Sequence, residues 1–392
     1  MTHSFNRLTT IAALDIGSSK VCCVIAKISR DKRINVVGYG YNASKGIKNG
    51  IVTDINQATL SVCNAVETAE QMANERIDRI IVNISGDKIK SIVKDATIAI
   101  NKNRPVSEAD ITKVIEKGIN KINVDEHELI HCLPTSYRLD MGDEIKDPRN
   151  IFGESLSVDI LLGLVPEIQY RNLSTVIENA HLETAEKAFS AYASGLSCLV
   201  EDEKEIGATV IDIGGGSLEV AMGSDEDPTV ALSVPAGAGR VTREFLPESG
   251  VADDDDLEAA RKNIRKILEP MVKAFPKSKH PMHAVGTSKT IRSLARLAGA
   301  VMRQPGRVDT SIMTIDQLED WLPRLAAIAP DQRTALPGVT PERTYQIVGG
   351  GLVIDEIMKA LDVKEIEICP WALREGAILR WLDQFGRTRL GF

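Results

Sequence analysis

The chain has 392 residues, 43% hydrophobic and 26% charged, with a formal net charge of −8. This composition is typical of a globular protein with room for two domains, and the acidic balance argues against a general nucleic-acid or anionic-membrane surface. Six cysteines without CxxC spacing are interpreted as free thiols of a cytoplasmic protein. No apolar run reaches about 18 residues, so we expect no transmembrane segment. The two ends indicate neither a signal sequence nor a clear membrane-anchoring helix.

Residue usage changes close to residue 207. Asparagine occurs 15 times in residues 1–206 and once in residues 207–392, whereas proline occurs 4 times and then 12 times. Uniform usage would not place nearly every asparagine in one half. We therefore predict two lobes with different histories, residues 1–206 and residues 207–392.

The first lobe is predicted to begin with strands. Residues 11–28 and 34–41 are rich in β-forming residues and indicate a meander. Residues 54–74 have helical periodicity, and residues 78–85 indicate a buried strand. The helix would place six apolar residues on one face: Ile55, Leu60, Val62, Val66, Ala69 and Met72.

A small α/β subdomain is predicted to interrupt this lobe over residues 87–165. Ser107 is suited to a helix N-cap, with Asp110 at the third helical position. The expected elements are an edge strand at 89–100, a helix over 107–119, and strands at 127–139 and 155–164.

Two helices are predicted after the subdomain, at residues 168–180 and 185–200. The second has small residues on one face, which favours close approach of another helix. An ordinary buried helix that happens to be rich in alanine would have the same pattern.

The second lobe is predicted to combine strands with helices. Its acidic run, residues 253–256, could bind a cation, but a solvated helix start explains it more simply. Gly349, Gly350 and Gly351 lie in a helical segment, where small residues allow helices to cross. The expected strands are 210–213, 218–234 with a polar turn at 223–228, 283–285 and 365–369, and the expected helices are a short one including 242–245, then 257–275, 290–297, 314–327, 342–361 and 371–385. The last helix is expected to pack back toward the hinge between the lobes.

Two similar motifs occur in different halves of the chain. In each, an apolar strand leads into Asp-Ile-Gly and further small residues: Asp15-Ile16-Gly17-Ser18-Ser19-Lys20 and Asp212-Ile213-Gly214-Gly215-Gly216-Ser217. Glycines permit a tight turn, and successive N–H groups in such a turn form a concave anion site. Asp15 and Asp212 are suited to hold Mg²⁺, mostly through water. Two facing hairpins would grip one polyphosphate, although either motif alone could be a strand end with a glycine turn.

A third glycine-bearing loop, Gly286-Thr287-Ser288, precedes a predicted helix. A loop that opens a helix offers N–H groups to an anion or a nucleotide phosphate. The loop lacks the full GxxxxGK[ST] pattern, so we do not interpret it as a P-loop.

The order of these segments resembles the actin/Hsp70/sugar-kinase ATPase fold. That fold has a phosphate hairpin, a small-residue helix, a second phosphate hairpin, a nucleotide loop and a second small-residue helix. The resemblance implies an α/β protein with two ribonuclease H-like lobes. It also implies a cleft between the lobes that holds ATP or polyphosphate with Mg²⁺.

The first lobe, from residue 8 to residue 206, resembles the bacterial cell-division protein FtsA. The matching segments are 13–22, 44–50, 82–86 and 125–134. The inserted subdomain lies where that family has its polymer-contacting subdomain. The resemblance therefore implies self-association or divisome contacts through residues 87–165. The surface that docks FtsZ and the membrane-binding helix of that family belong largely to the half that has no match here, so membrane recruitment and filament growth are not expected.

The second lobe, residues 207–392, resembles the C-terminal half of the exopolyphosphatase/guanosine pentaphosphate phosphatase (Ppx/GppA) family. The matching segments are 212–219, 235–242, 286–292, 342–343 and 372–376. In that family a glutamate-rich stretch before the second motif supplies the expected general base, but residues 195–203 do not match it. Glu219 matches the family's second acidic position. It is the remaining candidate for the base, unless it is only a solvent-side strand residue.

Three functions remain open at this point. The first is an actin-like module that binds a nucleotide or polyphosphate with weak or absent turnover. The second is a Mg²⁺-dependent phosphohydrolase that uses Glu219 and acts on polyphosphate, guanosine pentaphosphate or a nucleotide. The third is a folded chimera of the two families without activity. Binding needs only the loops, whereas hydrolysis also needs a positioned base, so the sequence favours the first.

Overall fold

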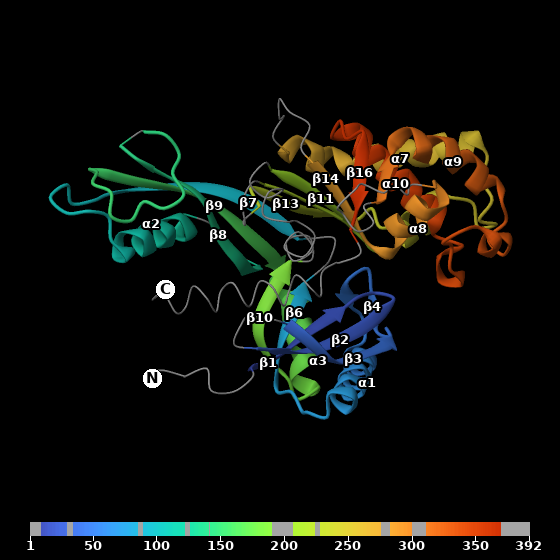
Figure 1. Ribbon diagram of the computed structural model, residues 1–392, viewed down its shortest axis with the longest axis horizontal. Coiled ribbons are helices and arrows are strands. Elements are labelled where there is room, and N and C mark those ends of the chain that lie inside the picture. Colours follow the sequence, from blue (N-terminus) through green and yellow to red (C-terminus); the bar gives the residue numbers. More distant parts are fainter. Residues whose placement is uncertain are drawn as a thin grey trace.

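The computed structural model describes residues 9–29, 34–84, 89–121, 126–140, 142–189, 207–223, 228–275, 283–299 and 311–369. Within these ranges the chain forms two lobes, each built on its own β-sheet, and an arm that projects away from them (Figure 1). The predicted α/β class with two lobes and an inserted subdomain is thereby confirmed.

The first lobe is built on a five-stranded sheet of order β10-β6-β1-β2-β3. Its strands are β1 Thr9–Ile16, β2 Lys20–Ile28, β3 Ile34–Ala43, β6 Arg79–Ile84 and β10 Glu183–Phe189. The first three form an antiparallel meander, and β6 runs parallel to both β1 and β10. Helices α1 (Ile55–Ala73) and α3 (Glu167–Asn179) pack on one face around a common apolar cluster. The short strands β4 (Ile47–Lys48) and β5 (Ile51–Val52) pair with each other.

Helix α1 forms where periodicity predicts it, but its buried face differs from the predicted one. The Asp54 side chain caps the helix by accepting a hydrogen bond from the N–H of Gln57 at 3.0 Å. Leu60 and Met72, expected in the core, are 57% and 62% exposed. The buried residues are mostly small, namely Ala58, Ser61, Val62, Ala65, Val66 and Ala69.

The glycines of β3 explain this choice of face. A Cβ added to Gly40 would lie 2.0 Å from the carbonyl oxygen of Ala65, and one added to Gly38 would lie 2.3 Å from that of Ala69. The helix backbone therefore lies directly on the strand, in a space too shallow for a leucine or methionine side chain. Periodicity identified the helix, and close packing selected its inner face.

The arm is the predicted inserted subdomain. It comprises β7 Lys90–Ala99, α2 Glu108–Asn120, β8 His127–Leu139 and β9 Ser155–Pro166. The strands form an antiparallel sheet of order β7-β9-β8, which places β7 at an edge as expected, and α2 packs on the sheet around its own apolar cluster. Ser107 and Asp110 form the predicted capping box at the start of α2.

Residues 183–189 form a strand, so the prediction of a helix beginning at residue 185 is wrong. Helix α3 ends at Asn179, and His181 adopts a left-handed backbone conformation with φ 59°. The chain then turns and joins the sheet parallel to β6, where Ala188 is fully buried. Pairing at the sheet edge thus outweighs the helix preference of an alanine-containing segment. The rest of that predicted helix and the stretch 195–203 lie outside the described residues.

The second lobe is built on a six-stranded sheet of order β13-β12-β11-β14-β16-β15. The strands are β11 Ala208–Ile213, β12 Leu218–Gly223, β13 Val230–Val234, β14 His283–Thr287, β15 Ser311–Thr314 and β16 Glu365–Ile368. The helices are α6 Ala238–Phe245, α7 Asp254–Ala274, α8 Lys289–Leu297, α9 Ile315–Ala327 and α10 Ile347–Ala360, with the 3-10 turns η1 Gln332–Ala335 and η2 Pro341–Arg343. Side chains from these helices and from one face of the sheet form one large apolar core.

Most of the predicted features of this lobe are present. Asp253 caps α7 and forms a capping box with Asp256, so the acidic run is a helix start. Helix α10 begins at Ile347 rather than at residue 342, because the preceding residues form η2. The predicted glycine crossing is confirmed, since a Cβ on Gly349 would lie 2.4 Å from Thr242 Oγ1 of α6. The predicted last helix, 371–385, and residues 224–227 of the polar turn lie outside the described residues.

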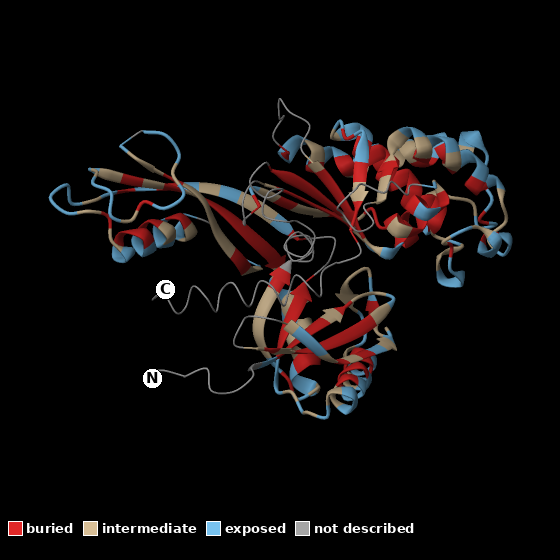
Figure 2. Cartoon of the chain, in the orientation of Figure 1, coloured by how far each residue is buried: buried red, intermediate tan, exposed pale blue. Residues whose placement is uncertain are grey.

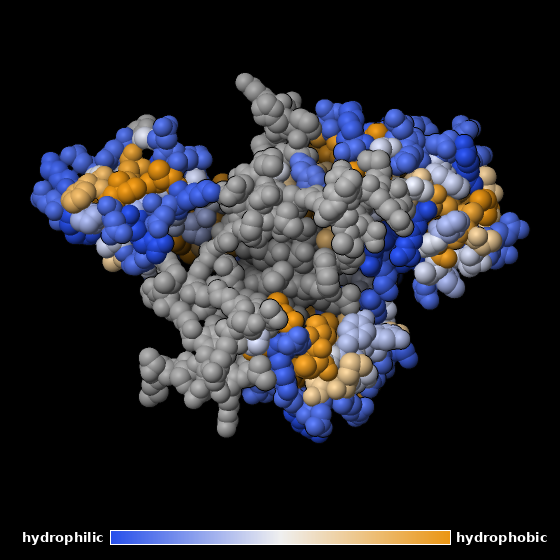
Figure 3. Space-filling view, in the orientation of Figure 1, coloured by the Kyte–Doolittle hydropathy of each residue, from blue (hydrophilic) through white to orange (hydrophobic). Residues whose placement is uncertain are grey.

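Burial follows the layers of each lobe. Figure 2 shows buried strands at the centre of each lobe and exposed positions on the outer faces of the helices. The arm carries apolar surface among hydrophilic residues in Figure 3, and its exposed apolar side chains include Val93, Ile151 and Phe152. Five cysteines lie within the described residues, and all five are free thiols. Among the described helices, none combines the length and apolarity that crossing a membrane requires.

Candidate functional site

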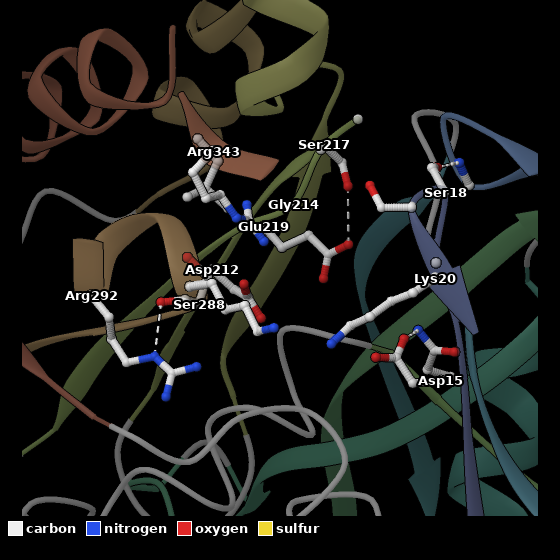
Figure 4. Close-up of a pocket in the computed structure, with 18 residues that line it drawn as sticks. Asp15, Ser18, Lys20, Asp212, Gly214, Ser217, Glu219, Ser288, Arg292 and Arg343 are labelled. Atoms are coloured by element: carbon white, nitrogen blue, oxygen red, sulfur yellow. Dashed lines mark hydrogen bonds between the residues drawn. The ribbon is translucent and has the colours of Figure 1, made fainter. Parts of the chain in front are cut away.

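A cavity of roughly 210 Å³ lies between the two lobes. The first lobe contributes the β1–β2 hairpin, and the second contributes the β11–β12 hairpin, the start of α8 and η2 (Figure 4). Twelve of the residues predicted for the site line this cavity: Asp15, Gly17, Ser18, Ser19, Lys20, Asp212, Gly214, Gly215, Gly216, Ser217, Glu219 and Ser288. The two predicted hairpins therefore open onto one shared space.

The two hairpins have the same local geometry. The N–H of Gly17 donates to the carbonyl of Lys20 at 3.0 Å, and the N–H of Gly214 donates to that of Ser217 at 2.9 Å. Their tips also approach each other. A Cβ on Gly215 would lie 3.6 Å from Ser19 Oγ of the first lobe. Small residues at both tips thus let the two turns approach each other closely.

A Cβ on Gly216 would lie 2.9 Å from the Cα of Asn49, a residue of the first lobe. Real Cβ atoms essentially never come this close to a backbone atom, so a side chain at residue 216 would push the lobes apart. The glycine is required here by the approach of the two lobes.

Asp15 is held by an amide from a neighbouring strand. Asn83, near the end of β6, accepts a hydrogen bond from the N–H of Ile16 at 2.8 Å. Its Nδ2 donates to Asp15 Oδ1 at 3.0 Å. The two bonds fix the orientation of the amide, and the amide in turn fixes one carboxylate oxygen at the mouth of the sheet.

Glu219 lies beside Asp212 on the paired strand β12. Its side chain reaches the cavity although the residue is only 6% exposed, so it is not a solvent-side strand residue. Ser217 Oγ donates to Glu219 Oε1 at 3.4 Å. Figure 4 shows Lys20 and Glu219 extending from opposite hairpins into the space between them.

The cavity carries both signs of charge. Three carboxylates, those of Asp15, Asp212 and Glu219, line it together with four cations, Lys20, Lys289, Arg292 and Arg343. The cations can bind a polyanion, and carboxylate oxygens are the ligands that Mg²⁺ prefers. This combination suits a phosphate compound that arrives with a divalent cation.

Several cavity residues were not among the predicted site residues: Gly50, Asn83, Ile213, Lys289, Arg292 and Arg343. Lys289 directly follows Ser288, and Arg292 lies one helical turn after Ser288, so both could have been proposed from the sequence once Ser288 was. Asn83 and Arg343 come from separate segments, and only folding brings them to the hairpins.

Arg343 is anchored from outside the cavity. Its Nη1 donates to Thr290 Oγ1 at 2.9 Å. Burial lowers the pKa of Arg343, the neighbouring Glu342 raises it, and the positive charge of Arg292 lowers it. An arginine remains protonated despite such shifts, so two adjacent cations lie on one wall and favour an anion between them.

The third predicted loop contributes only its last residue. Gly286 and Thr287 belong to strand β14, and neither lines the cavity. A Cβ on Gly286 would lie 2.6 Å from Ile366 Cγ2, so this glycine allows two strands to pack. Ser288 caps α8 with φ 110°, a backbone conformation that non-glycine residues rarely adopt. Strain of this kind typically occurs at ligand sites.

The donor set fits Mg²⁺ held mainly by water and ligand phosphates. Asp15 and Asp212 line the same cavity from opposite lobes. Among the described residues, no group of three or more His, Cys, Asp or Glu side chains could hold a metal ion. Mg²⁺ keeps several waters and commonly binds through one or two carboxylates plus phosphate oxygens.

Comparison with known proteins finds both predicted families. The SHS2 domain inserted in FtsA matches residues 86–162. The cell division protein FtsA of Rhizobium meliloti is 34% identical over 249 residues, which is 61% of this chain and 56% of that protein. Exopolyphosphatase 1 of Mycobacterium bovis is 44% identical over 178 residues, which is 44% of this chain and 50% of that protein. The chain thus spans about half the length of the curated relatives that it matches.

The fold comparison covers nearly the whole chain. The crystal structure of the Ppx/GppA family member of Aquifex aeolicus superposes with a TM-score of 0.57 at 15% identity, covering 97% of this chain and 99% of that chain. At this identity the likeness shows the fold, which is the actin-like ATPase fold predicted from the sequence.

The family match also covers the second lobe. The Ppx/GppA phosphatase family matches residues 184–385 and so begins before the junction predicted at residue 207. Because this match spans more than half of the sequence, the chain belongs to the Ppx/GppA phosphatase family.

Proposed function

We propose that the cavity between the lobes binds a chain of phosphoric anhydrides together with Mg²⁺. Such ligands include inorganic polyphosphate and the phosphate tail of a nucleotide such as ATP. The observation that carries the proposal is the convergence of two glycine turns, four cations and three carboxylates on one space. The glycine turns offer N–H groups to phosphate oxygens, and the cations neutralise the charge.

The lining favours the phosphates over a base or sugar as the recognised part of the ligand. Among the lining residues that the structure describes, Ile213 is the one with an aliphatic side chain, and none is aromatic. Pockets that recognise small organic ligands are lined mostly by hydrophobic and aromatic side chains. A site of glycines, serines and charges matches a ligand made of phosphate groups.

Bound Mg²⁺ would neutralise phosphate charge and would be held by Asp15 and Asp212 through water. Lys20, Arg292 and Arg343 would contact phosphate oxygens directly. Asn83 keeps Asp15 oriented by donating to one of its carboxylate oxygens at 3.0 Å. The hairpin glycines leave room for the anion to approach the backbone.

Calorimetric titration of the full chain with Mg²⁺ and tripolyphosphate tests this proposal. Arg343→Met should weaken binding about 10- to 100-fold, because a charge-assisted hydrogen bond contributes about 1.5–3 kcal/mol. Arg324→Met is the matched control, since this arginine pairs with Asp320 on the exposed surface of α9. Unchanged affinity in Arg343→Met, or equal losses in both variants, would contradict the proposed site.

Hydrolysis of the bound anhydride is the second candidate function. The observation that favours it is the carboxylate of Glu219, which reaches the cavity from a residue that is 6% exposed. Water would attack the terminal phosphorus while Glu219 takes its proton. The bridging P–O bond would break, and orthophosphate and a chain one phosphate shorter would leave. Whether turnover is rapid depends on how closely Glu219 approaches that water.

Phosphate release with and without Glu219→Gln separates binding from hydrolysis. Loss of a general base typically slows a reaction about 10²- to 10⁴-fold, so release should fall while tripolyphosphate binding persists. Glu365→Gln, on the exposed surface of β16, is the control. Equal release from Glu219→Gln and the parent would remove Glu219 from the mechanism. No release from the parent would leave a binding protein, and neither release nor binding would identify an inactive fold.

A further inference from the structure

The second hairpin is held from behind by helix α6. The N–H of Ala238 donates to the carbonyl of Gly214 at 2.9 Å, and the N–H of Arg240 donates to the carbonyl of Gly215 at 2.9 Å. In a planar trans peptide the carbonyl and the following N–H point in opposite directions. With both carbonyls directed at α6, the N–H groups of Gly215 and Gly216 point away from that helix.

The side of the hairpin away from α6 is the cavity. Gly215 and Gly216 both line it, whereas α6 contributes none of the lining residues that the structure describes. The contact between α6 and the hairpin therefore decides where two anion-binding N–H groups point. It would also hold the two carbonyl oxygens, which repel phosphate, on the far side.

Helix α6 packs tightly against the backbone of the hairpin. A Cβ on Gly237, its N-cap residue, would lie 2.4 Å from backbone atoms of Gly216. Any displacement of α6 toward the cavity would therefore move the turn itself.

Helix α10 packs tightly against α6. A Cβ on Gly349 would lie 2.4 Å from Thr242 Oγ1 and 2.8 Å from the carbonyl oxygen of Ala238, both on α6. Thr242 is 1% exposed, and its Oγ1 donates to the same carbonyl at 2.8 Å. Because a backbone atom is among these contacts, a methyl group at residue 349 would have to move α6.

We infer that Gly349 is a positioning residue for the anion site, acting through α6 on the N–H groups of Gly215 and Gly216. The three atoms nearest to a Cβ at residue 349 all belong to α6, which contributes none of the described lining residues. The absent side chain therefore sets the distance between the two helices. The inference rests on the proposed function, because it assigns a cause to the affinity of that same cavity.

The test compares two glycines of the same helix. Gly349→Ala should weaken tripolyphosphate binding in the presence of Mg²⁺ by at least about 10-fold. Losing a single hydrogen bond from a backbone N–H to a charged phosphate oxygen is enough for such a decrease in affinity. Gly351→Ala is the control. Its Cβ would meet Leu322 Cδ2 at 2.5 Å, the end of a flexible side chain on α9, and not α6. Its affinity should stay within about 2-fold of the parent.

Each outcome of the titration decides between the two claims. Weaker binding in Gly349→Ala alone supports the inference. Equal affinities in all three proteins, or equal losses in both variants, overturn the inference and leave the proposed function standing. A parent chain that binds no tripolyphosphate overturns both.

A measurement on the parent covers the case in which Gly349→Ala does not fold. In ¹⁵N-glycine-labelled protein, the amide signals of Gly215 and Gly216 should shift when Mg²⁺ and tripolyphosphate are added. The amide of Gly351, inside α10, should not respond. If binding occurs without any shift of Gly215 and Gly216, their N–H groups do not face the ligand and the inference is wrong.

Discussion

Asp110 stabilises the start of helix α2 in the inserted subdomain. Arg104 donates to both carboxylate oxygens of Asp110, at 2.6 and 2.9 Å, and the N–H of Ser107 donates at 2.9 Å. The bonds from Arg104 come first in holding the pKa of Asp110 well below its usual range; burial opposes them, and Ser107 adds to the lowering. The negative charge at the third position of α2 also interacts favourably with the positive end of the helix dipole.

Replacing Asp110 with asparagine should make α2 less stable by about 1 kcal/mol at pH 7, because the hydrogen bonds from Arg104 and Ser107 would no longer reach a charged group. The folded pKa is lowered, so this contribution is complete above the unfolded value of about 3.9 and is lost as pH falls through the folded pKa. Hydrogen exchange of the α2 amides should therefore be faster in Asp110→Asn above about pH 5, and the difference should shrink below about pH 4. Asp143→Asn, an exposed change after β8 and outside α2, should alter nothing. A difference that stays constant at low pH would contradict the role of the charge.

At the scale of single residues, the sequence predicted what is local. Asp15 and Asp212 could be placed because each ends a strand and is followed by small residues within a few positions. Asn83 and Arg343 lie in segments that the family resemblances matched, 82–86 and 342–343, but their places at the cavity depend on a neighbouring strand and on a 3-10 turn far along the chain. Gly286 was predicted to belong to the site because the local sequence resembles a glycine loop before a helix. In the structure it lies in β14, where the absence of a side chain makes room for Ile366 of β16.

At the scale of elements, Arg333 joins three segments of the second lobe. It is fully buried, and burial lowers its pKa. Its guanidinium donates to three backbone carbonyls: that of Leu325 near the end of α9 at 3.1 Å, that of Thr344 directly after η2 at 2.6 Å, and that of Gly250 before α7. The segment that carries Arg343 into the cavity is thereby tied to the lobe's core.

Arg333→Met should lower the free energy of unfolding by about 3 kcal/mol or more, because several buried carbonyls lose their donors. Arg333→Lys should also be destabilising, since an ammonium group lacks the planar spread of a guanidinium. Urea unfolding midpoints measure both effects, with Arg324→Met as an exposed control expected within about 0.5 kcal/mol of the parent. Equal midpoints for Arg333→Met and this control would show that the carbonyls find other partners.

Helices were predictable where the sequence has a clear helical periodicity or a recognisable capping residue. The periodicity of α1 and the capping residues of α2 and α7 identified those helices. The predicted helix at 185–200 failed at its start because a place beside β6 was free for a strand, a fact of the assembled sheet. Likewise, the inner face of α1 depends on Gly38 and Gly40 of β3, which no helical pattern reveals.

At the scale of the molecule, the two halves of the chain meet at more than one place. The tip of the second hairpin approaches Ser19 of the first hairpin through Gly215, and it approaches Asn49, in the turn between β4 and β5, through Gly216. The arm also reaches the second lobe, since Ser91 Oγ of β7 donates to the carbonyl of Ala231 on β13. The sequence predicted two lobes from residue usage and an insertion from its pattern of elements, and the family resemblances agreed with both. It could not predict these contacts, which depend on residues from both halves.

The central claim is that this shared cavity binds a phosphoric anhydride, and the thermal stability of the full chain tests it most directly. A ligand that binds only the folded state stabilises it by about 2.7 kcal/mol at 100 times its Kd. Millimolar tripolyphosphate or ATP with Mg²⁺ should therefore raise the Tm by several degrees in scanning calorimetry. An unchanged Tm with both ligands would contradict the account.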